Sequence, residues 1–168
     1  MSTGKNKYLL PIIESILYVY AEEINYFLPS MDDKHKFIVL KSGCSWKSIY
    51  FTPGSQEFTE TEKIDDAGSI FEQALKFIFP GDDHGNALLF ETLSNRPIVV
   101  LIKFCNSTII ILGDTDNPAR LTTDLQLTGK LNGQKIQISR QGSCRVPWWG
   151  DIQTIPVPED EIPGTPLG

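Results

Sequence analysis

Residues 69–80 read SIFEQALKFIFP, and whether this stretch forms a strand or a helix decides the fold of the chain. Its centre, EQALKF, is made of residues that favour helices. Its large apolar side chains, however, recur at a spacing of two residues: Phe71, Leu75, Phe77 and Phe79. Glu72 and Lys76 fall on the opposite face, although Gln73 joins the apolar side and two isoleucines join the charged side. We predict a strand over 69–79, with a helix as the alternative.

The same stretch forms the second arm of a long hairpin. WKSIYFTPGSQEFTETEKI (46–64) precedes it, and Asp65-Asp66-Ala67-Gly68 between the arms is a typical turn sequence. Pro53-Gly54 predicts a bulge or kink, which divides the first arm into strands over 46–53 and 57–64. Both arms exceed the usual strand length of about five or six residues. We therefore expect the hairpin to protrude from the rest of the domain.

Other runs of β-branched and aromatic residues are separated by Gly, Pro, Asn and Asp at intervals of about ten residues, which is typical of β-sandwiches and barrels. Tight bends at 104–108 and at Asn132-Gly133 are expected to join neighbouring strands into hairpins. The fold class is predicted to be mainly β (α+β), an antiparallel β-sandwich or half-barrel. Its strands are predicted over 9–21, 36–42, 46–53, 57–64, 69–79, 97–105, 107–113, 119–128 and 133–140.

One short helix is predicted over 85–94. Asn86 is a suitable N-cap, and Asn95-Arg96-Pro97 ends the helical pattern. Three apolar residues of this segment share one helical face: Ala87, Phe90 and Leu93. After this domain, which we place at residues 1–153, the segment 154–168 is rich in proline and acidic residues and is expected to be an extended tail.

Composition restricts the classes of function. The hydrophobic share of 40% and the charged share of 21% are those of a folded globular protein. No apolar run approaches the ~18 residues of a membrane span. The net charge of −6 disfavours a nucleic-acid reader, which needs a basic face. The three cysteines form no CxxC pair, so neither a disulfide framework nor a zinc site is expected.

The acidic loops of the chain offer a candidate metal site, and the sequence can be compared with known catalytic and phosphate-binding motifs. Asp114, Asp116 and Asn117 resemble the start of a calcium loop, but Pro118, Ala119 and Leu125 stand where an EF-hand needs an oxygen ligand, Gly and Glu. We predict a turn there. GxSxG, GxxxxGK[ST] and GxGxxG do not occur in the sequence. We therefore predict a protein that is not an enzyme, with no cofactor, no metal and no small-molecule substrate.

The order of several segments resembles that in a family of small structural proteins from phages and prophages of Bacteroides-type bacteria. The resemblance covers most of residues 36–149 and rests on the succession of motifs. These are KSGCSWKSIYFTPGSQEFTETEK (41–63), DDAGSIFEQALKFIFPG (65–81), NRPIVVLIKF (95–104), ILGDTDNPARL (111–121) and NGQKIQISRQGSCRVPWW (132–149).

The resemblance implies a virion protein of the tail-tube class, whose copies join edge to edge into rings, usually sixfold, and contact other virion proteins. DNA would pass through the ring without specific binding. Glu57, Glu60 and Glu62 could line such a lumen, although alternation places Glu57 on the opposite face from the other two; a plain solvated edge is the alternative. Contacts between subunits would involve Trp148, Trp149, Pro156 and Pro158. A head–tail connector, tail terminator or baseplate hub subunit is compatible with the same pattern.

Two hypotheses from other classes stay open at this point. In a small carbohydrate-binding β-sandwich, Trp46, Trp148 and Trp149 would stack on sugar rings. A glycoside-processing enzyme with carboxylates on separate strands is the weaker one.

Overall fold

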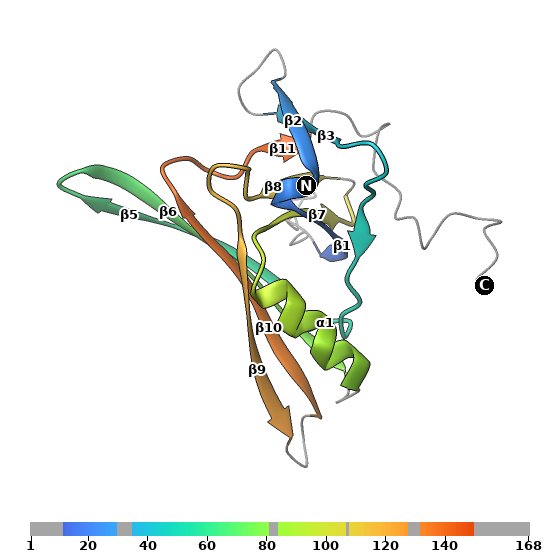
Figure 1. The fold of residues 1–168 in the computed structure, drawn as a ribbon. Helices are drawn as coiled ribbons and strands as arrows, with labels where there is room; N and C mark the ends of the chain where they lie inside the picture. Colours follow the sequence, from blue (N-terminus) through green and yellow to red (C-terminus); the bar gives the residue numbers. More distant parts are fainter. Residues whose placement is uncertain (1–11, 30–34, 81–83, 107, 128–131, 150–168) are drawn as a thin grey trace, which may run out of the picture.

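The computed structural model describes residues 12–29, 35–80, 84–106, 108–127 and 132–149. This part of the chain forms two β-sheets and one α-helix (Figure 1). The predicted mainly β class with a single short helix is confirmed for these residues. The tail over 154–168, with Pro156 and Pro158, lies outside the described residues.

Sheet A has seven strands in the order β2-β3-β11-β8-β7-β1-β4. Neighbouring strands are antiparallel except β3 and β11, which are parallel. The strands are β1 (Ile13–Tyr20), β2 (Ile24–Pro29), β3 (His35–Leu40), β4 (Lys47–Ser48), β7 (Ile98–Phe104), β8 (Ile109–Leu112) and β11 (Trp148–Trp149). The apolar run IVVLI of β7 is buried on both faces of the sheet, as expected for a strand covered on both sides.

Sheet A is strongly curved. β1 and β2 are separated only by the 3-10 turn η1 (Ala21–Glu23), yet four strands lie between them in the sheet order. Three residues span at most about 14 Å, whereas five strand steps of about 4.8 Å would cover about 24 Å in a flat sheet. The sheet must therefore bend until its β2 edge approaches the end of β1. The concave side of this bend holds a hydrophobic cluster: Leu17, Val19, Ile24, Ile38, Trp46, Val99, Leu101, Ile109 and Ile111.

Sheet B has four antiparallel strands in the order β5-β6-β10-β9. They are β5 (Glu57–Asp65), β6 (Gly68–Pro80), β10 (Asn132–Gly142) and β9 (Arg120–Leu127). The sheet is staggered: β5 pairs with β6 from Gly68 to Lys76, while β10 pairs with β6 from Phe71 to Pro80. The β5–β6 hairpin therefore extends beyond one end of the sheet (Figure 1).

The main core lies between sheet B, the convex side of sheet A and the helix α1 (His84–Ser94). Phe90 and Leu93 are fully buried there, and the rings of Phe79 and Phe90 meet edge to face at 4.9 Å. β6 contributes Phe71, Gln73, Leu75, Phe77 and Phe79 from one face, so its burial alternates with a period of two. The strand prediction for 69–79 is confirmed, and the local helix preference of EQALKF is overridden by this pattern.

Several predicted elements need correction. The strand over 46–53 is wrong beyond Lys47–Ser48, because Pro53-Gly54 forms a turn, with φ of +84° at Gly54, in place of a bulge. The N–H of Thr52 donates to Ile78 O (2.8 Å), so this turn still lies beside β6. The first arm of the hairpin consequently begins at Glu57.

Two short elements were not predicted, and one cap was misplaced. β2 is a separate strand after β1, and residues 9–11 of the predicted strand 9–21 lie outside the described part of the chain. β11 pairs with β3 and β8, and the sequence around it has no local pattern that predicts a strand. The helix begins at His84, so Asn86 lies within it and is not the N-cap. The hairpins β7–β8 and β9–β10 are confirmed by their registers. The predicted bend at Asn132-Gly133 is wrong, because both residues lie in β10 and pair with Leu127 and Gln126.

Candidate functional site

The end of the β5–β6 hairpin projects beyond the rest of sheet B and is largely exposed. The pair Glu62–Phe71 is the last row that continues into β10, at Gly142. Beyond this row, residues 63–70 pair only with each other, and nearly all are exposed. Ile64 is 79% exposed and Ile70 is 38% exposed, on opposite faces of the ribbon. A two-stranded ribbon of this kind is only marginally stable alone.

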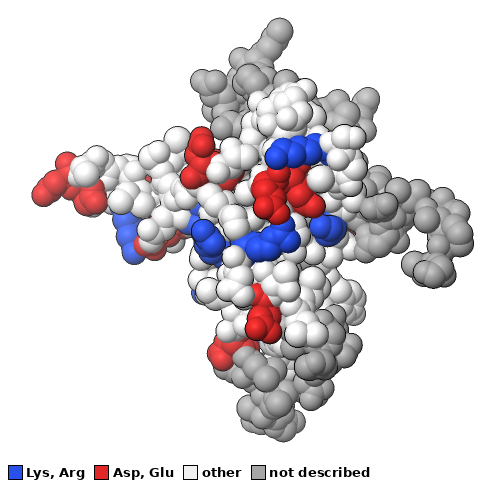
Figure 2. All heavy atoms as spheres, viewed as in Figure 1, with Lys and Arg blue, Asp and Glu red and all other residues white. Residues whose placement is uncertain are grey.

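Polar contacts hold the free ribbon in shape. The Lys63 ammonium forms an ion pair with Glu72 (2.8 Å), and the Ser69 hydroxyl donates to Glu62 (2.8 Å). At the turn, the N–H of Ala67 donates to the Asp65 carboxylate (2.8 Å), and Gly68 adopts a φ of +123° that favours glycine. Acidic side chains gather at this tip, at the left end of the view in Figure 2.

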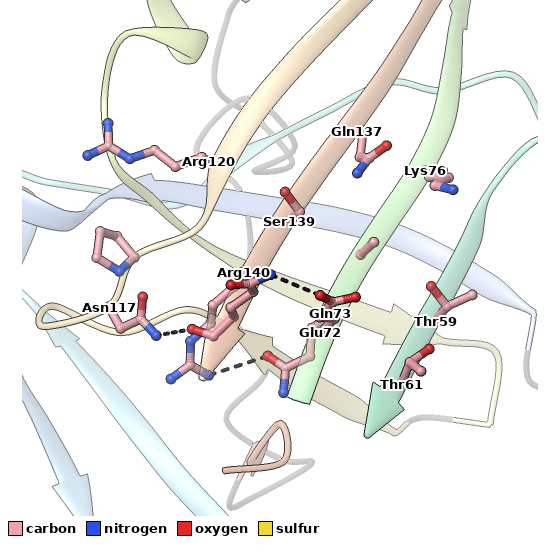
Figure 3. Close-up of a pocket in the computed structure, with 13 residues that line it drawn as sticks. Thr59, Thr61, Glu72, Gln73, Lys76, Asn117, Arg120, Gln137, Ser139 and Arg140 are labelled. Carbon is pink, nitrogen blue, oxygen red and sulfur yellow. Dashed lines mark hydrogen bonds between the residues drawn. The ribbon is translucent and has the colours of Figure 1, made fainter. Parts of the chain in front are cut away.

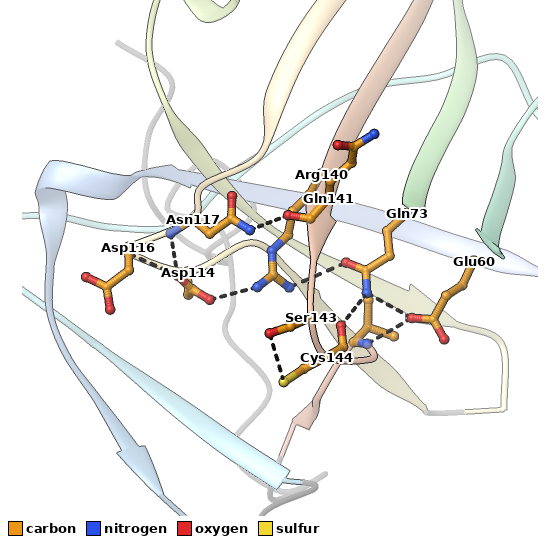
Figure 4. A network of polar contacts seen from close by, with 10 residues as sticks. Glu60, Gln73, Asp114, Asp116, Asn117, Arg140, Gln141, Ser143 and Cys144 are labelled. Carbon is orange, nitrogen blue, oxygen red and sulfur yellow. Dashed lines mark hydrogen bonds and ion pairs between the residues drawn. The ribbon is translucent and has the colours of Figure 1, made fainter. Parts of the chain in front are cut away.

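The base of the hairpin is anchored by a polar network (Figure 4). Arg140, whose side chain is 8% exposed, forms an ion pair with Asp114 (2.9 Å) and donates to Gln73 Oε1 (3.4 Å). Gln73 in turn donates to Glu60 (2.9 Å) and to the carbonyl oxygen of Cys144 (3.2 Å). The chain of contacts therefore links β5, β6 and β10 to the turn after β8.

Glu60 is the far end of this network. Its carboxylate accepts the N–H of Val146 (2.9 Å) and lies 3.3 Å from the Arg145 guanidinium. Glu62 lies 3.7 Å from the same guanidinium. Glu60 and Glu62 are on the core-side face of β5, and Glu57 is on its solvent face, as alternation predicted. Two of the three candidate lumen residues thus make contacts within one copy.

The segment Asp114–Asn117 is a turn, as predicted. One oxygen of the Asp114 carboxylate accepts the N–H groups of Asp116 (2.9 Å) and Asn117 (2.6 Å), and the other oxygen faces Arg140. Both oxygens are therefore engaged by donors within the protein. Gly113 precedes the turn at φ +98°, where a Cβ atom would lie 2.8 Å from Ala119 N. The turn is thus built to hold Arg140 and to let two chain segments approach closely.

The solvent face of sheet B forms a polar groove of about 810 Å³ (Figure 3). Its lining includes Thr59, Thr61, Lys76, Arg120, Gln137 and Ser139. Charges on this face occur largely in pairs: Glu57 is directly opposite Lys76, and Lys63 is bound to Glu72. Short hydroxyl and amide side chains between the charges make a hydrated surface with little net charge.

The three tryptophans of the carbohydrate-binding hypothesis lie in different parts of sheet A. Trp46 is 7% exposed inside the concave side of sheet A, so the hypothesis that it stacks on a sugar ring is wrong. Trp148 and Trp149 form β11, in which Trp148 pairs with His35 and Ile110 and Trp149 pairs with Lys36. Their backbones are thus inside sheet A, and their side chains lie outside what the structure describes.

Two searches for other kinds of site gave no result within the described residues. No three side chains of His, Cys, Asp or Glu are grouped so that they could hold a metal ion. No helix in the described ranges is long and apolar enough to span a membrane.

Sequence reasoning missed Arg140 and Gln73, the centre of the polar network. A signal was available: both residues continue an alternating apolar face, Gln73 between Phe71 and Leu75, and Arg140 after Ile136 and Ile138. A polar residue at such a position is buried and needs partners, but the partners come from the distant turn at Asp114.

Comparison of the chain with protein-family models, with curated proteins and with solved structures gave no match.

Proposed function

We propose that this protein is a self-assembling structural component of a phage virion, of the tail-tube type, whose copies join edge to edge into a ring around a DNA conduit. The observation that carries the proposal is the β5–β6 hairpin, which extends beyond its own core and exposes Ile64. The projecting strand β5 is also an outer strand of sheet B, and an outer strand presents backbone N–H and C=O groups that can pair with another chain.

The two edges of sheet B support a ring over a symmetric dimer. β5 and β9 are the outer strands of the sheet, and they differ in sequence and direction. When two different edges pair, the contact is head to tail, and repetition by rotation closes a ring. Closure also removes the free strand edges that otherwise promote aggregation. A head–tail connector, terminator or baseplate hub subunit would use these same edges.

In a ring closed through sheet B, the solvent face of the sheet lines the conduit. Sheet A and α1 add bulk on the other face, and curvature places the bulkier side outside. The lining then contains Glu57 and the paired charges and hydroxyl groups of the polar groove. A hydrated lining with little positive potential lets a polyanion pass without adhering, because binding needs an excess of cationic groups.

The experiment is size-exclusion chromatography with light scattering, followed by negative-stain microscopy of the full chain across a concentration series. We expect rings or stacked tubes with a central hole, and no retention of double-stranded DNA in a gel-shift assay at physiological salt. A protein that stays monomeric at every concentration contradicts the proposal. Tight DNA binding by the assembled form contradicts the role of the groove as a lining.

A further inference from the structure

The two outer strands of sheet B, β5 and β9, differ in charge and in exposed apolar groups. The edge of β9 that a second copy could use begins after Ala119, whose N–H and C=O are both hydrogen-bonded to Ile98. β5 carries Lys63, Ile64 and Asp65 at its projecting end, and β9 begins with Arg120 and Leu121. Arg120 is exposed and has no acidic partner among the described residues. We propose that β5 of one copy pairs antiparallel with β9 of a second copy in one register, with Asp65 opposite Arg120. This inference rests on the proposed function and specifies its interface.

Alternation limits the registers that are possible. On β5 the core-side residues are Phe58, Glu60, Glu62 and Ile64, and on β9 the core-side position Leu121 is buried. If the two sheets continue each other, core-side residues must face core-side residues across the seam. A slip by one residue would turn Ile64 towards solvent, so only slips by two residues are allowed.

Charge selects among the allowed registers. With Asp65 opposite Arg120, all of β9 is paired with 58–65, Ile64 is opposite Leu121, and Lys63 lies diagonal to Asp124. A slip by two residues one way brings Lys63 opposite Arg120, which is repulsive. The opposite slip leaves Arg120 unpaired and places Ile64 opposite Thr123. Opposite charges across strands stabilise a sheet and like charges destabilise it. The register in which all of β9 is paired with β5 is therefore also the register in which opposite charges face each other.

The geometry of a closed barrel agrees with this register. Within one copy, Arg120 lies in the row of Ser139, Ala74 and Thr59. The seam would place Asp65 of the next copy in that row, a shift of six residues for every four strands. This shift is about 20 Å along the strands for about 19 Å across them. It corresponds to a strand tilt of about 45°, at the upper end of the range of closed barrels.

The seam also accounts for the exposure of Ile64. In one copy its side chain extends past the end of the core and is 79% exposed. In the proposed register it lies in the row of Leu121 of the second copy, which is already buried in its own core at 1% exposure, and diagonal to the exposed Thr123. The seam would thereby cover Ile64 at the margin of the neighbouring core.

Disulfide trapping tests the register. In a chain with Cys44, Cys105 and Cys144 replaced by Ser, Lys63→Cys combined with Thr122→Cys places two cysteines directly opposite across the seam, within bonding range. We expect oxidation to give a ladder of covalently linked copies. The matched control, Thr61→Cys with Thr122→Cys, is opposite only in the register slipped by two and should link several-fold less. A stronger ladder in the control overturns the inference.

Charge exchange gives a second test that keeps the native cysteines. Asp65→Arg and Arg120→Asp should each raise the concentration for half-assembly about threefold to tenfold, and the double variant should restore assembly. Asp66→Arg makes the same charge change one residue outside the seam and should leave assembly near the wild-type level. A wild type that never assembles refutes the proposed function; a wild type that assembles while the double variant shows no rescue refutes only the register.

Discussion

At the scale of single residues, the feature that most shapes the molecule is a set of polar side chains at positions where the alternation of sheet B would place core residues. Gln73 is 1% exposed, and the Arg140 side chain is 8% exposed. A buried guanidinium is tolerated only with charged and polar partners, because its desolvation is costly. Asp114 and Gln73 supply them, and the hairpin base is thereby fastened to the turn after β8.

Arg140→Met should therefore lower the stability of the protein while the chain keeps the same fold. The variant leaves the Asp114 carboxylate without its cation and Gln73 Oε1 without a donor, so we expect a loss of about 3 kcal/mol in the free energy of unfolding. Urea unfolding followed by circular dichroism measures the change. Arg120→Met removes an exposed arginine from the same sheet and should cost less than about 0.5 kcal/mol. Equal losses in the two variants would contradict the anchoring role of Arg140.

At the scale of secondary-structure elements, β5 is a strand that contributes little to the core. Its sequence, EFTETEKID, has few apolar residues, and its residues from Thr61 onward are all exposed. Its pairing with β6 and the contacts of Glu60 hold its first half. Glu62 still lies 3.7 Å from Arg145, and after Glu62 the strand is paired only with β6 among the described residues. We therefore propose that this end takes part in the contact between copies.

Shortening the hairpin should separate folding from assembly. Glu62 and Phe71 are directly opposite, so replacing residues 63–70 by Asn-Gly closes a two-residue turn there. Because the removed part is almost entirely exposed and its contacts with Glu62 and Glu72 are polar surface contacts, we expect the free energy of unfolding to change by less than about 1 kcal/mol. The variant should elute as a monomer at concentrations where the wild type forms rings. Ring formation by the shortened chain would show that the hairpin is not part of the interface.

At the scale of the whole molecule, the stability of the backbone is expected to be uneven. β7 lies in the interior of sheet A and is buried on both faces, whereas the end of the β5–β6 hairpin is almost entirely exposed. Local opening follows such differences, since segments with few buried contacts exchange their amide protons without global unfolding.

Hydrogen exchange read by mass spectrometry should therefore report the assembly directly. In dilute, unassembled protein we expect the amides of β7 to exchange slowest and those of residues 63–70 fastest. In the assembled protein the amides of β5 and β9 should slow down together, because both edges become paired, while those of β7 should hardly change. Protection that appears at β2 or β4, the edges of sheet A, and not at β5 and β9 would assign the contact to the other sheet.

Much of the element content could be predicted from the sequence, and the reasons are local. Alternation identified β6, although its helix-forming residues argued otherwise, and the bend after Phe104 identified the β7–β8 hairpin. The β9–β10 pairing was also predicted, but from a bend at Asn132-Gly133 that the structure places inside β10. The failures have different causes. β11 is a two-residue strand held by β3 and β8, which are remote in the chain, whereas β2 pairs with β3, the next strand, across residues 30–34. Pro53-Gly54 fits both a kink within a strand and a turn that ends one, and only the tertiary structure shows the turn.

The sequence by itself determined that the chain is mainly β, that 69–79 is a strand with Gln73 on its apolar face, and that Asp114–Asn117 is a turn, because alternation and turn chemistry act between near neighbours in the chain. Only the tertiary structure decided that sheet A bends so that β1 runs directly into β2, that Trp46 is buried in this bend, and that Arg140 joins Asp114 to Gln73. These features arise from contacts between residues far apart in the sequence, and a buried charge shows its partner only when the chain has brought the two together.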